Sequence, residues 1–213
     1  MTLEIDNLTL RFRDRPALFA PLTLRIAPGE VGTVMGPSGV GKSTLLDAIA
    51  GHLAHGFTLT GDVRLNGQSV LRLPPERRRI GLVFQDAVLF PHLSVGDNLA
   101  FGLTPDIRGR AARANAVEQA LIRAGLAGLA PRDPATLSGG QRARVALMRA
   151  LLAEPMALLM DEPFSKLDAN LRSEMRSFAF AHIRERDIPA LVVTHDPADA
   201  EVANGPKFLL SVA

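Results

Sequence analysis

The chain has 213 residues, of which 47% are apolar, 24 are basic and 22 are acidic. This length suits one well-packed core, and the apolar content excludes an intrinsically disordered chain. The formal net charge of +2 is too small to predict a nucleic-acid-binding surface, so no nucleic-acid partner is expected. The chain contains no cysteine, which excludes disulfides and thiolate metal sites.

The N-terminal segment MTLEIDNLTLRF alternates polar and apolar side chains and lacks the apolar block of a signal peptide. No apolar run approaches the length that is needed to span a membrane. We therefore expect any role at a membrane to come through a partner protein.

Residues 3–12 and 22–26 alternate polar and apolar side chains, which predicts two strands with one buried face. Residues 60–69 predict a third strand, with an Asn-Gly turn at Asn66 and Gly67 near its end. We expect these three strands to pair as a small antiparallel sheet.

Four other segments are continuous apolar runs, at residues 31–36, 80–84, 157–160 and 190–194. Such runs are typical of strands that are buried on both faces, as in a parallel sheet covered by helices. The residues at their ends are Gly36, Gln85, Asp161 and His195. Because ligands bind at the carboxyl ends of strands in open α/β sheets, we expect these residues to meet at one edge.

Residues 88–153 predict mainly helix, including an alanine- and leucine-rich segment at residues 111–129. The predicted strands all fall in residues 1–87 and 154–213. We therefore predict one α/β domain over residues 1–213, with a mainly parallel core sheet, an N-terminal antiparallel β-subdomain and an inserted helical subdomain.

The segment GPSGVGKST follows a buried strand and opens a helix that is expected to end at Gly51. This is the phosphate-loop pattern, in which backbone N–H groups and the positive end of a helix surround a polyphosphate. Lys42 is expected to reach the β- and γ-phosphates, and the hydroxyl of Ser43 to bind Mg²⁺. The predicted phosphate-binding residues are Gly36, Pro37, Ser38, Gly39, Val40, Gly41, Lys42, Ser43 and Thr44.

The segment ALLMDEP places two carboxylates at the end of another buried strand. Asp161 is expected to bind Mg²⁺ through water, and Glu162 to orient or deprotonate the attacking water. Taken alone, an apolar run followed by Asp161 and Glu162 is also typical of a turn that ends a strand. Beside a phosphate loop, however, they predict a core that hydrolyses nucleoside triphosphates.

The segment LSGGQ, at residues 137–141, places Gly139 and Gly140 where a long helical segment begins. Glycine is costly inside a helix and is favoured where another group must approach the backbone closely. The phosphate loop lies far earlier in the sequence, so these residues leave open the question of which group approaches the two glycines.

These motifs together resemble the ATP-binding-cassette (ABC) family, specifically the nucleotide-binding subunit of an ABC transporter. The resemblance spans nearly the whole chain. In family order, the matching motifs are the phosphate loop, the Q-loop at Gln85, the signature LSGGQ, the Walker B segment ALLMDE, the D-loop SKLD at 165–168 and the switch histidine in VTHD at 193–196.

The resemblance implies that ATP is bound between two copies packed head to tail, with one copy's phosphate loop facing the other copy's signature. The start of a helix with serine and glycines offers free N–H groups and a positive dipole end to such a phosphate. The implied nucleotide-binding residues outside the phosphate loop are Ser138, Gly139, Gly140, Gln141 and Asp168. The implied catalytic residues are Glu162, His195, Gln85 and Lys42, with His195 contacting the γ-phosphate and Gln85 also binding Mg²⁺.

The family also stacks an aromatic side chain on adenine. Phe12 matches this position and replaces the more frequent tyrosine, which keeps the stacking face and loses a hydroxyl. Phe19 is an alternative, because the sequence does not fix the register of this stretch.

The stretch 84–103 resembles the importer branch of the family, in which the groove beside the Q-loop receives a short permease helix. The implied partners are a second copy, integral membrane permease subunits and a substrate-binding protein. The implied location is the cytoplasmic face of the inner membrane, where the permease would hold the chain peripherally. Many relatives carry a C-terminal regulatory domain, which is not expected here.

Two alternatives have weaker support. A soluble ABC ATPase of chromosome maintenance needs a long coiled coil between phosphate loop and signature, and one of translation needs two cassettes in a chain. A monomeric nucleotide kinase would leave LSGGQ and His195 without roles.

Several basic residues need interpretation. Lys166 stands where the D-loop usually carries alanine, which adds a charge near the expected interface. Arg77, Arg78 and Arg79 are expected to form a solvated rim, whereas Arg142, Arg144 and Arg149 are expected to pack or pair around the signature helix.

Overall fold

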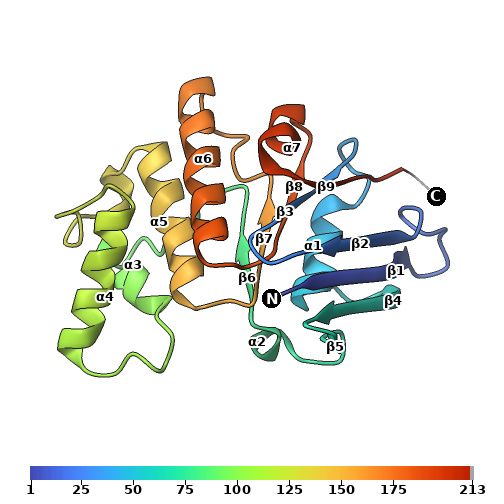
Figure 1. Ribbon diagram of the computed structural model, residues 1–213, viewed down its shortest axis with the longest axis horizontal. Coiled ribbons are helices and arrows are strands. Elements are labelled where there is room, and N and C mark those ends of the chain that lie inside the picture. Colours follow the sequence, from blue (N-terminus) through green and yellow to red (C-terminus); the bar gives the residue numbers. More distant parts are fainter. Residues whose placement is uncertain (212–213) are drawn as a thin grey trace.

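The computed structural model describes residues 1–211 (Figure 1). The strands are β1 (Leu3–Phe12), β2 (Leu22–Ile26), β3 (Val31–Met35), β4 (Phe57–Leu65), β5 (Gln68–Ser69), β6 (Ile80–Val83), β7 (Ala157–Asp161), β8 (Ala190–Thr194) and β9 (Asn204–Leu209). The helices are α1 (Lys42–Ala50), α2 (Pro75–Arg78), α3 (Val95–Phe101), α4 (Arg110–Arg123), the short 3₁₀ helix η1 (Pro134–Thr136), α5 (Gly139–Leu152), α6 (Ala169–Glu185) and α7 (Pro197–Ala203).

The first sheet is antiparallel, with strand order β2-β1-β4-β5, as the alternating segments predict. In β2, buried and exposed residues alternate strictly, so one face of the strand packs on the core. The third predicted strand begins earlier than expected, at Phe57. Asn66 and Gly67 both have positive φ, 51° and 78°, which suits a tight hairpin turn and returns the chain into β5.

The second sheet contains five parallel strands in the order β6-β7-β8-β3-β9, and four of them are the predicted apolar runs. The fifth strand, β9, was not predicted, because its sequence NGPKFL contains glycine and proline and has no apolar run. It lies at the edge of the sheet, where proline is tolerated because one side of the strand needs no backbone donor.

The parallel sheet separates two hydrophobic cores, and successive residues of a strand enter different cores. On β7, Leu158 and Met160 face the core shared with α3, α4, α5 and α6, whereas Leu159 faces the core shared with α1 and the antiparallel sheet. This period of two explains why the central strands are apolar at every position. Figure 1 shows the antiparallel sheet and α1 at one end of the molecule, and α3, α4 and α5 at the other.

The helices α3, α4 and α5 all lie between β6 and β7 in the chain, within the segment that predicted helix. The helix expected at 111–129 ends sooner, at Arg123. Gly125 and Gly128 have φ values of 68° and 78°, a left-handed conformation that stops an α-helix. Over residues 1–211, every helix is too short or too polar to cross a membrane.

Arg78 does not belong to a solvated rim as expected, although Arg77 and Arg79 are exposed. Its guanidinium is buried and donates to the carbonyl oxygens of Ala48 and Ile49, both at 2.8 Å, where α1 ends. Two further hydrogen bonds reach the carbonyls of Leu71 and Leu73. The last carbonyls of a helix have no partners within it, so Arg78 stabilises the end of the helix that follows the phosphate loop.

Candidate nucleotide site

The phosphate loop lies at the carboxyl edge of the parallel sheet, between β3 and α1. Gly41 has φ 102° and precedes the first residue of α1, which begins without any side-chain cap. Gly39 is also left-handed, and a Cβ placed there would meet no atom within 4 Å. The loop therefore presents open backbone and uncapped N–H groups, which is the arrangement that binds a phosphate.

A cavity of about 400 Å³ opens over this loop. Of the four predicted strand-end residues, Gln85 and Asp161 line this cavity. Its lining residues are Ser38, Gly39, Gly41, Lys42, Ser43, Thr44, Gln85, Asp161 and Glu162. Of the other predicted loop residues, Val40 is buried at 5% exposure, while Gly36 and Pro37 form the base of the loop. The oxygen donors of Ser43, Gln85 and Asp161 are the kind that a hard divalent cation prefers.

Lys42 is buried at 6% exposure, and three oxygen atoms hold its ammonium group. Nζ donates to the carbonyls of Gly36 and Pro37 at 2.9 and 3.1 Å, and lies 3.7 Å from Oε1 of Glu162. A positive charge is thereby fixed at the wall of the cavity, next to a carboxylate.

Glu162 lies between Lys42 and His195. Its Oε2 atom is 3.1 Å from Nδ1 of His195, and its backbone N–H donates to Val193 at 2.9 Å. Its φ of 42° is rare for a residue other than glycine, and such strain is common at functional sites. The ends of β7 and β8 therefore fix this carboxylate through its backbone as well as its side chain.

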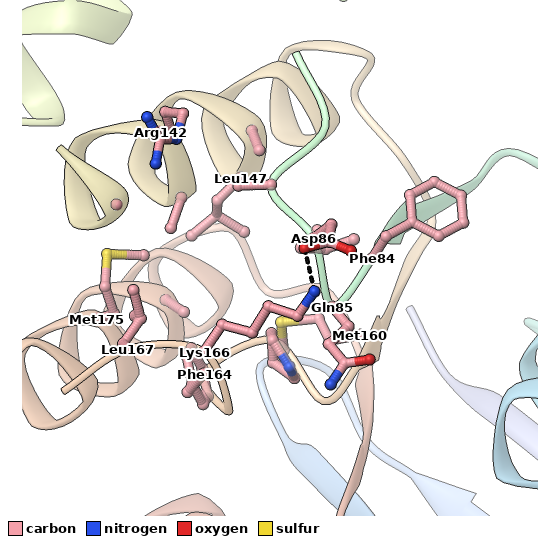
Figure 2. A pocket seen from close by; sticks show the side chains of 17 residues that line it. Phe84, Gln85, Asp86, Arg142, Leu147, Met160, Phe164, Lys166, Leu167 and Met175 are labelled. Atoms are coloured by element: carbon pink, nitrogen blue, oxygen red, sulfur yellow. Dashed lines mark hydrogen bonds and ion pairs between the residues drawn. The ribbon is translucent and has the colours of Figure 1, made fainter. Parts of the chain in front are cut away.

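The Q-loop contacts the D-loop directly. Nε2 of Gln85 donates to Oγ of Ser165 at 3.2 Å, and that hydroxyl donates to the carbonyl oxygen of Glu162 at 2.9 Å. One residue further along each loop, Lys166 forms an ion pair with Asp86. Figure 2 shows Lys166 extended toward Asp86 across a second cavity, of about 200 Å³, between these loops and α5.

The signature motif begins α5 with a complete capping box. Oγ of Ser138 accepts from the backbone N–H of Gln141 at 3.2 Å, and Oε1 of Gln141 accepts from that of Ser138 at 2.9 Å. Arg142, Arg144 and Arg149 donate to carbonyl oxygens around this helix, as predicted.

The two signature glycines differ in their surroundings. A Cβ at Gly140 would lie 2.9 Å from Cδ2 of Leu171, so any larger residue there must move the end of this leucine side chain on α6. A Cβ at Gly139 would meet only Cδ2 of Leu167, at an ordinary 3.8 Å, and Gly139 is exposed. Residues 137–141 are not among those described as lining the cavity over the phosphate loop.

The two aromatic candidates occupy different environments. Phe19 is fully buried, with no exposed face. Phe12 ends β1 and is half-buried; its ring packs against Phe57 at 4.9 Å between centroids, with the guanidinium of Arg13 5.1 Å from its centre. Asp168, the last predicted residue of the nucleotide site, caps α6 by accepting from the N–H of Leu171 at 3.0 Å.

Sequence reasoning missed the groups that hold the loops together. Arg172 donates to the D-loop carbonyls of Ser165 and Leu167 and to Asp196, which follows the switch histidine. Asp86 was missed as the partner of Lys166. The unusual lysine was a signal that a nearby acid should exist, but the sequence does not show which one.

The strand–loop–helix unit with Lys42 and Ser43, beside a strand that ends in two carboxylates, defines the class of phosphate-loop nucleoside triphosphatases. A family model described as ABC transporter matches residues 19–165. The chain belongs to the ABC transporter family.

Individual relatives agree with this assignment. The chain is 50% identical over 204 residues to the ABC transporter ATP-binding protein YnjD of Escherichia coli, covering 94% of this chain and 93% of that protein. It is 43% identical to the spermidine/putrescine import ATP-binding protein PotA of Pseudomonas fluorescens and 44% identical to the sulfate/thiosulfate import ATP-binding protein CysA of Gloeobacter violaceus. The matches cover 94% of this chain in both cases, but only 55% and 57% of those two relatives.

A solved structure gives the same result. The structure of cbiO1 from Clostridium perfringens, part of the ABC transporter complex cbiONQ, matches with a TM-score of 0.86 and 29% identity, over 98% of this chain and 84% of that one. The chain is therefore an ATP-binding subunit that hydrolyses ATP to power transport. These relatives support the transporter assignment and give no support to a role in translation or chromosome maintenance.

Proposed function

We propose that this chain works as a head-to-tail dimer, with each ATP held between the phosphate loop of one copy and the signature helix of the other, and that the dimer drives solute uptake through a membrane permease. The observation that carries the proposal is the separation of the two halves of the site. The cavity over the phosphate loop contains charged groups for the chemistry, while the exposed Gly139 at the start of α5 has room for a methyl group, which among the described residues would meet only Leu167, at 3.8 Å.

Within one copy, the residues of the cavity have separate roles. Lys42 binds the β- and γ-phosphates, and the loop N–H groups surround them. Ser43, Gln85 and Asp161 would hold Mg²⁺, which supplies positive charge against the phosphates when it is bound. Glu162 accepts the proton of the attacking water or orients that water.

His195 contacts the γ-phosphate in this proposal. Its ring is 58% exposed and 3.1 Å from Glu162, so it can reach the cavity without leaving the carboxylate that orients it. Between Lys42 and His195, Glu162 has a hydrogen-bonding partner near each of its oxygens. This arrangement supports a base that is held in one orientation at the strand end.

Phe12 stacks on adenine in this proposal, and its half-buried ring supports the choice over Phe19. Phe19 has no accessible face and packs beneath the loop, 3.6 Å from where a Cβ of Gly41 would lie. The guanidinium of Arg13 beside Phe12 adds a cation that favours a stacked nucleotide.

Across the dimer, Ser138, Gly139, Gly140, Gln141 and Asp168 face the nucleotide of the second copy. Gly139 and Gly140 occupy the first two positions of α5, whose N–H groups have no acceptor within the helix. The positive end of the helix dipole favours a γ-phosphate there. Two such sites related by a two-fold axis make one closed dimer.

The permease would dock beside the Q-loop. Phe84, Val88 and Phe101 are exposed at 52%, 57% and 69%, which is unusual for large apolar side chains in this chain. Apolar exposure of this kind is typical of a protein–protein contact. The names of the relatives PotA and CysA support import, with a substrate-binding protein as a further partner and the cytoplasmic face of the membrane as the location.

The test mixes two inactive variants. Lys42→Ala destroys the phosphate loop, and Ser138→Arg blocks the signature, so each variant alone should lack ATPase activity. In a 1:1 mixture, about half of the dimers pair the two variants and contain one intact shared site, so about a quarter of the wild-type activity should return. Occlusion of one ATP per mixed dimer is the second readout.

A mixture of Lys42→Ala with Lys42→Arg is the matched control, because both chains then lack the same half of the site and no activity should return. Full activity in Ser138→Arg alone, or no ATP occlusion in the mixture of complementary variants, would contradict the shared site.

A further inference from the structure

Arg172, in the first turn of α6, connects the D-loop to the loop that carries the switch histidine. Its Nη2 atom donates to the carbonyl oxygens of Leu167 and Ser165 at 3.1 and 3.4 Å. Its Nη1 atom donates to Oδ2 of Asp196 at 3.2 Å. One guanidinium therefore contacts two loops that approach the γ-phosphate in the proposed site.

The position of Arg172 is energetically unfavourable in two respects. A cation is disfavoured in the first turn of a helix, where the dipole is positive. In addition, Nε of Arg172 is buried and has no hydrogen-bond partner among the described residues, which is costly for an N–H group. Departures of this kind are expected where function, rather than stability, requires a residue.

The carboxylate of Asp196 also has several hydrogen-bonding and charged partners. Its Oδ1 atom caps α7 by accepting from Ala198 at 2.9 Å, and its Oδ2 atom also lies 3.5 Å from Arg176. Burial alone would raise the pKa of Asp196, but the N–H of Ala198 together with Arg172 and Arg176 holds the pKa below its usual value. The carboxylate that meets Arg172 is therefore charged at neutral pH.

Thr194, on the other side of His195, belongs to a network that also includes Asp196. Arg176 contacts the carboxylates of both Asp196 and Asp199. The Oγ1 atom of Thr194 accepts from the backbone N–H of Asp196 at 3.0 Å. Its hydroxyl donates to Asp199 at 2.6 Å, and Arg176 donates to the same carboxylate at 2.8 Å. The backbone on both sides of His195 is thus anchored. The D-loop reaches the Val193 side through Ser165 and Glu162, and it reaches the Asp196 side through the guanidinium of Arg172.

We propose that Arg172 is a positioning residue: by bridging the D-loop carbonyls and Asp196, it places His195 against the γ-phosphate only while the D-loop is packed in its place. The inference rests on the proposed function of His195. It assigns the coupling between the two loops to one side chain, which acts through His195 and does not touch the nucleotide.

The experiment measures steady-state ATP hydrolysis by the full chain carrying Arg172→Ala. Misplacement of a catalytic group lowers the rate without weakening ground-state binding, so kcat should fall about 10- to 100-fold while KM for ATP changes less than about threefold. Arg172→Lys should recover only part of the rate, because an ammonium cannot bridge both loops in the way that a planar fork does. Full recovery with lysine would overturn the bridging role.

Arg184→Ala is the matched control. Arg184 lies on the same helix and donates to backbone carbonyls at the end of α7, at 3.4 and 3.5 Å, but it does not contact the switch loop. Its replacement should leave kcat within about twofold of wild type. An equal loss of kcat in both variants would overturn the proposal, because it would show a general effect of removing arginine from α6.

Asp196→Asn breaks the same connection from the other side and retains a side-chain oxygen to cap α7. It should lower kcat like Arg172→Ala, and the double variant should be no worse than either single one. Multiplying losses would overturn the proposal. This variant also provides the test if Arg172→Ala does not fold.

Single-turnover rates in the His195→Ala background separate positioning from a purely structural role. There Arg172→Ala should cost less than about twofold, because the group it positions is already missing. A loss as large as in the wild-type background would show that Arg172 acts independently of His195. Normal ATP turnover by the single variant His195→Ala would contradict the proposed function itself, whereas unchanged kcat in Arg172→Ala contradicts only this inference.

Discussion

Glycine stands at the start of a helix in both the phosphate loop and the signature motif, as the residue before α1 and as the first residue of α5, but the surroundings differ. At the phosphate loop, α1 begins without a side-chain cap, and Lys42, Asp161 and Glu162 gather at one cavity. At the signature, Ser138 and Gln141 complete a capping box. The phosphate loop therefore has charged side chains and free backbone N–H groups around a cavity. The start of the signature helix has a satisfied side-chain cap and an exposed glycine. This difference is the basis of the proposal that the signature meets a phosphate bound by a second copy.

The largest expected effect tests the chemistry of the first region. Glu162→Gln removes the proposed base and keeps its shape, so ATP binding should persist while hydrolysis slows by about 10²-fold or more. The uncleaved ATP should then trap a dimer, detectable by size-exclusion chromatography with light scattering. Glu185→Gln, at the last residue of α6, is the control and should behave as wild type. Normal hydrolysis by Glu162→Gln would remove this residue from the mechanism.

The second prediction compares the two signature glycines. Gly139→Ala adds a methyl group where no neighbour is displaced, so it should keep or slightly raise the melting temperature, because replacing glycine by alanine in a compatible backbone conformation stabilises by about 0.4–1 kcal/mol. ATP-driven dimerisation and ATPase activity should nevertheless fall about tenfold, because the methyl group occupies the face proposed to meet the second copy's phosphate.

Gly140→Ala, in contrast, should not raise the melting temperature and is expected to lower it. Its methyl group must displace Leu171, so the gain in helix propensity should be lost or reversed. If Gly139→Ala hydrolyses ATP at the wild-type rate, the exposed glycine has no role at the nucleotide.

The third prediction concerns the raised pKa of a carboxylate on α1, the helix that follows the phosphate loop. Burial raises the pKa of Asp47 on α1; His52 lowers it in part and Asp161 raises it. Because the folded state disfavours this charge, Asp47→Asn should raise the melting temperature at pH 7. The gain should shrink as the pH falls through the raised pKa and vanish below the ordinary value of 3.8, where Asp47 is protonated in both states. The exposed Asp106→Asn is the control, and a gain that does not depend on pH would contradict this explanation.

The smallest expected effect concerns the ion pair between Lys166 and Asp86. Both side chains are more than half exposed, so Lys166→Ala should lower the free energy of unfolding by no more than about 1 kcal/mol, and less at high salt. Lys207→Ala, on β9, is the control. A loss of several kcal/mol would show that the D-loop depends on this lysine more than its exposure indicates.

The sequence predicted the features that depend on local pattern. The alternation of β1 and β2 and the apolar runs of β3, β6, β7 and β8 follow from which faces are buried. The helix after the phosphate loop ends at Gly51 as predicted, because a left-handed residue there stops α1. The edge strand β9 was missed because it is not buried on both faces.

The features that escaped prediction depend on contacts between distant segments. Arg78, the last residue of α2, caps α1 from 29 residues further along the chain than Ile49, and Gly140 packs on Leu171 of another helix. Arg172 joins the D-loop to Asp196, 24 residues away. A run of arginines or a pair of glycines gives no sign of such partners, since they become neighbours only after folding.

The central claim is that one copy does not form a complete site, and the specific ATPase activity of the wild-type chain as a function of its concentration tests this most directly. Activity per chain should fall toward zero on dilution, in step with loss of the dimer in the same samples. A constant activity per chain, at concentrations where only monomer is present, would contradict the shared site.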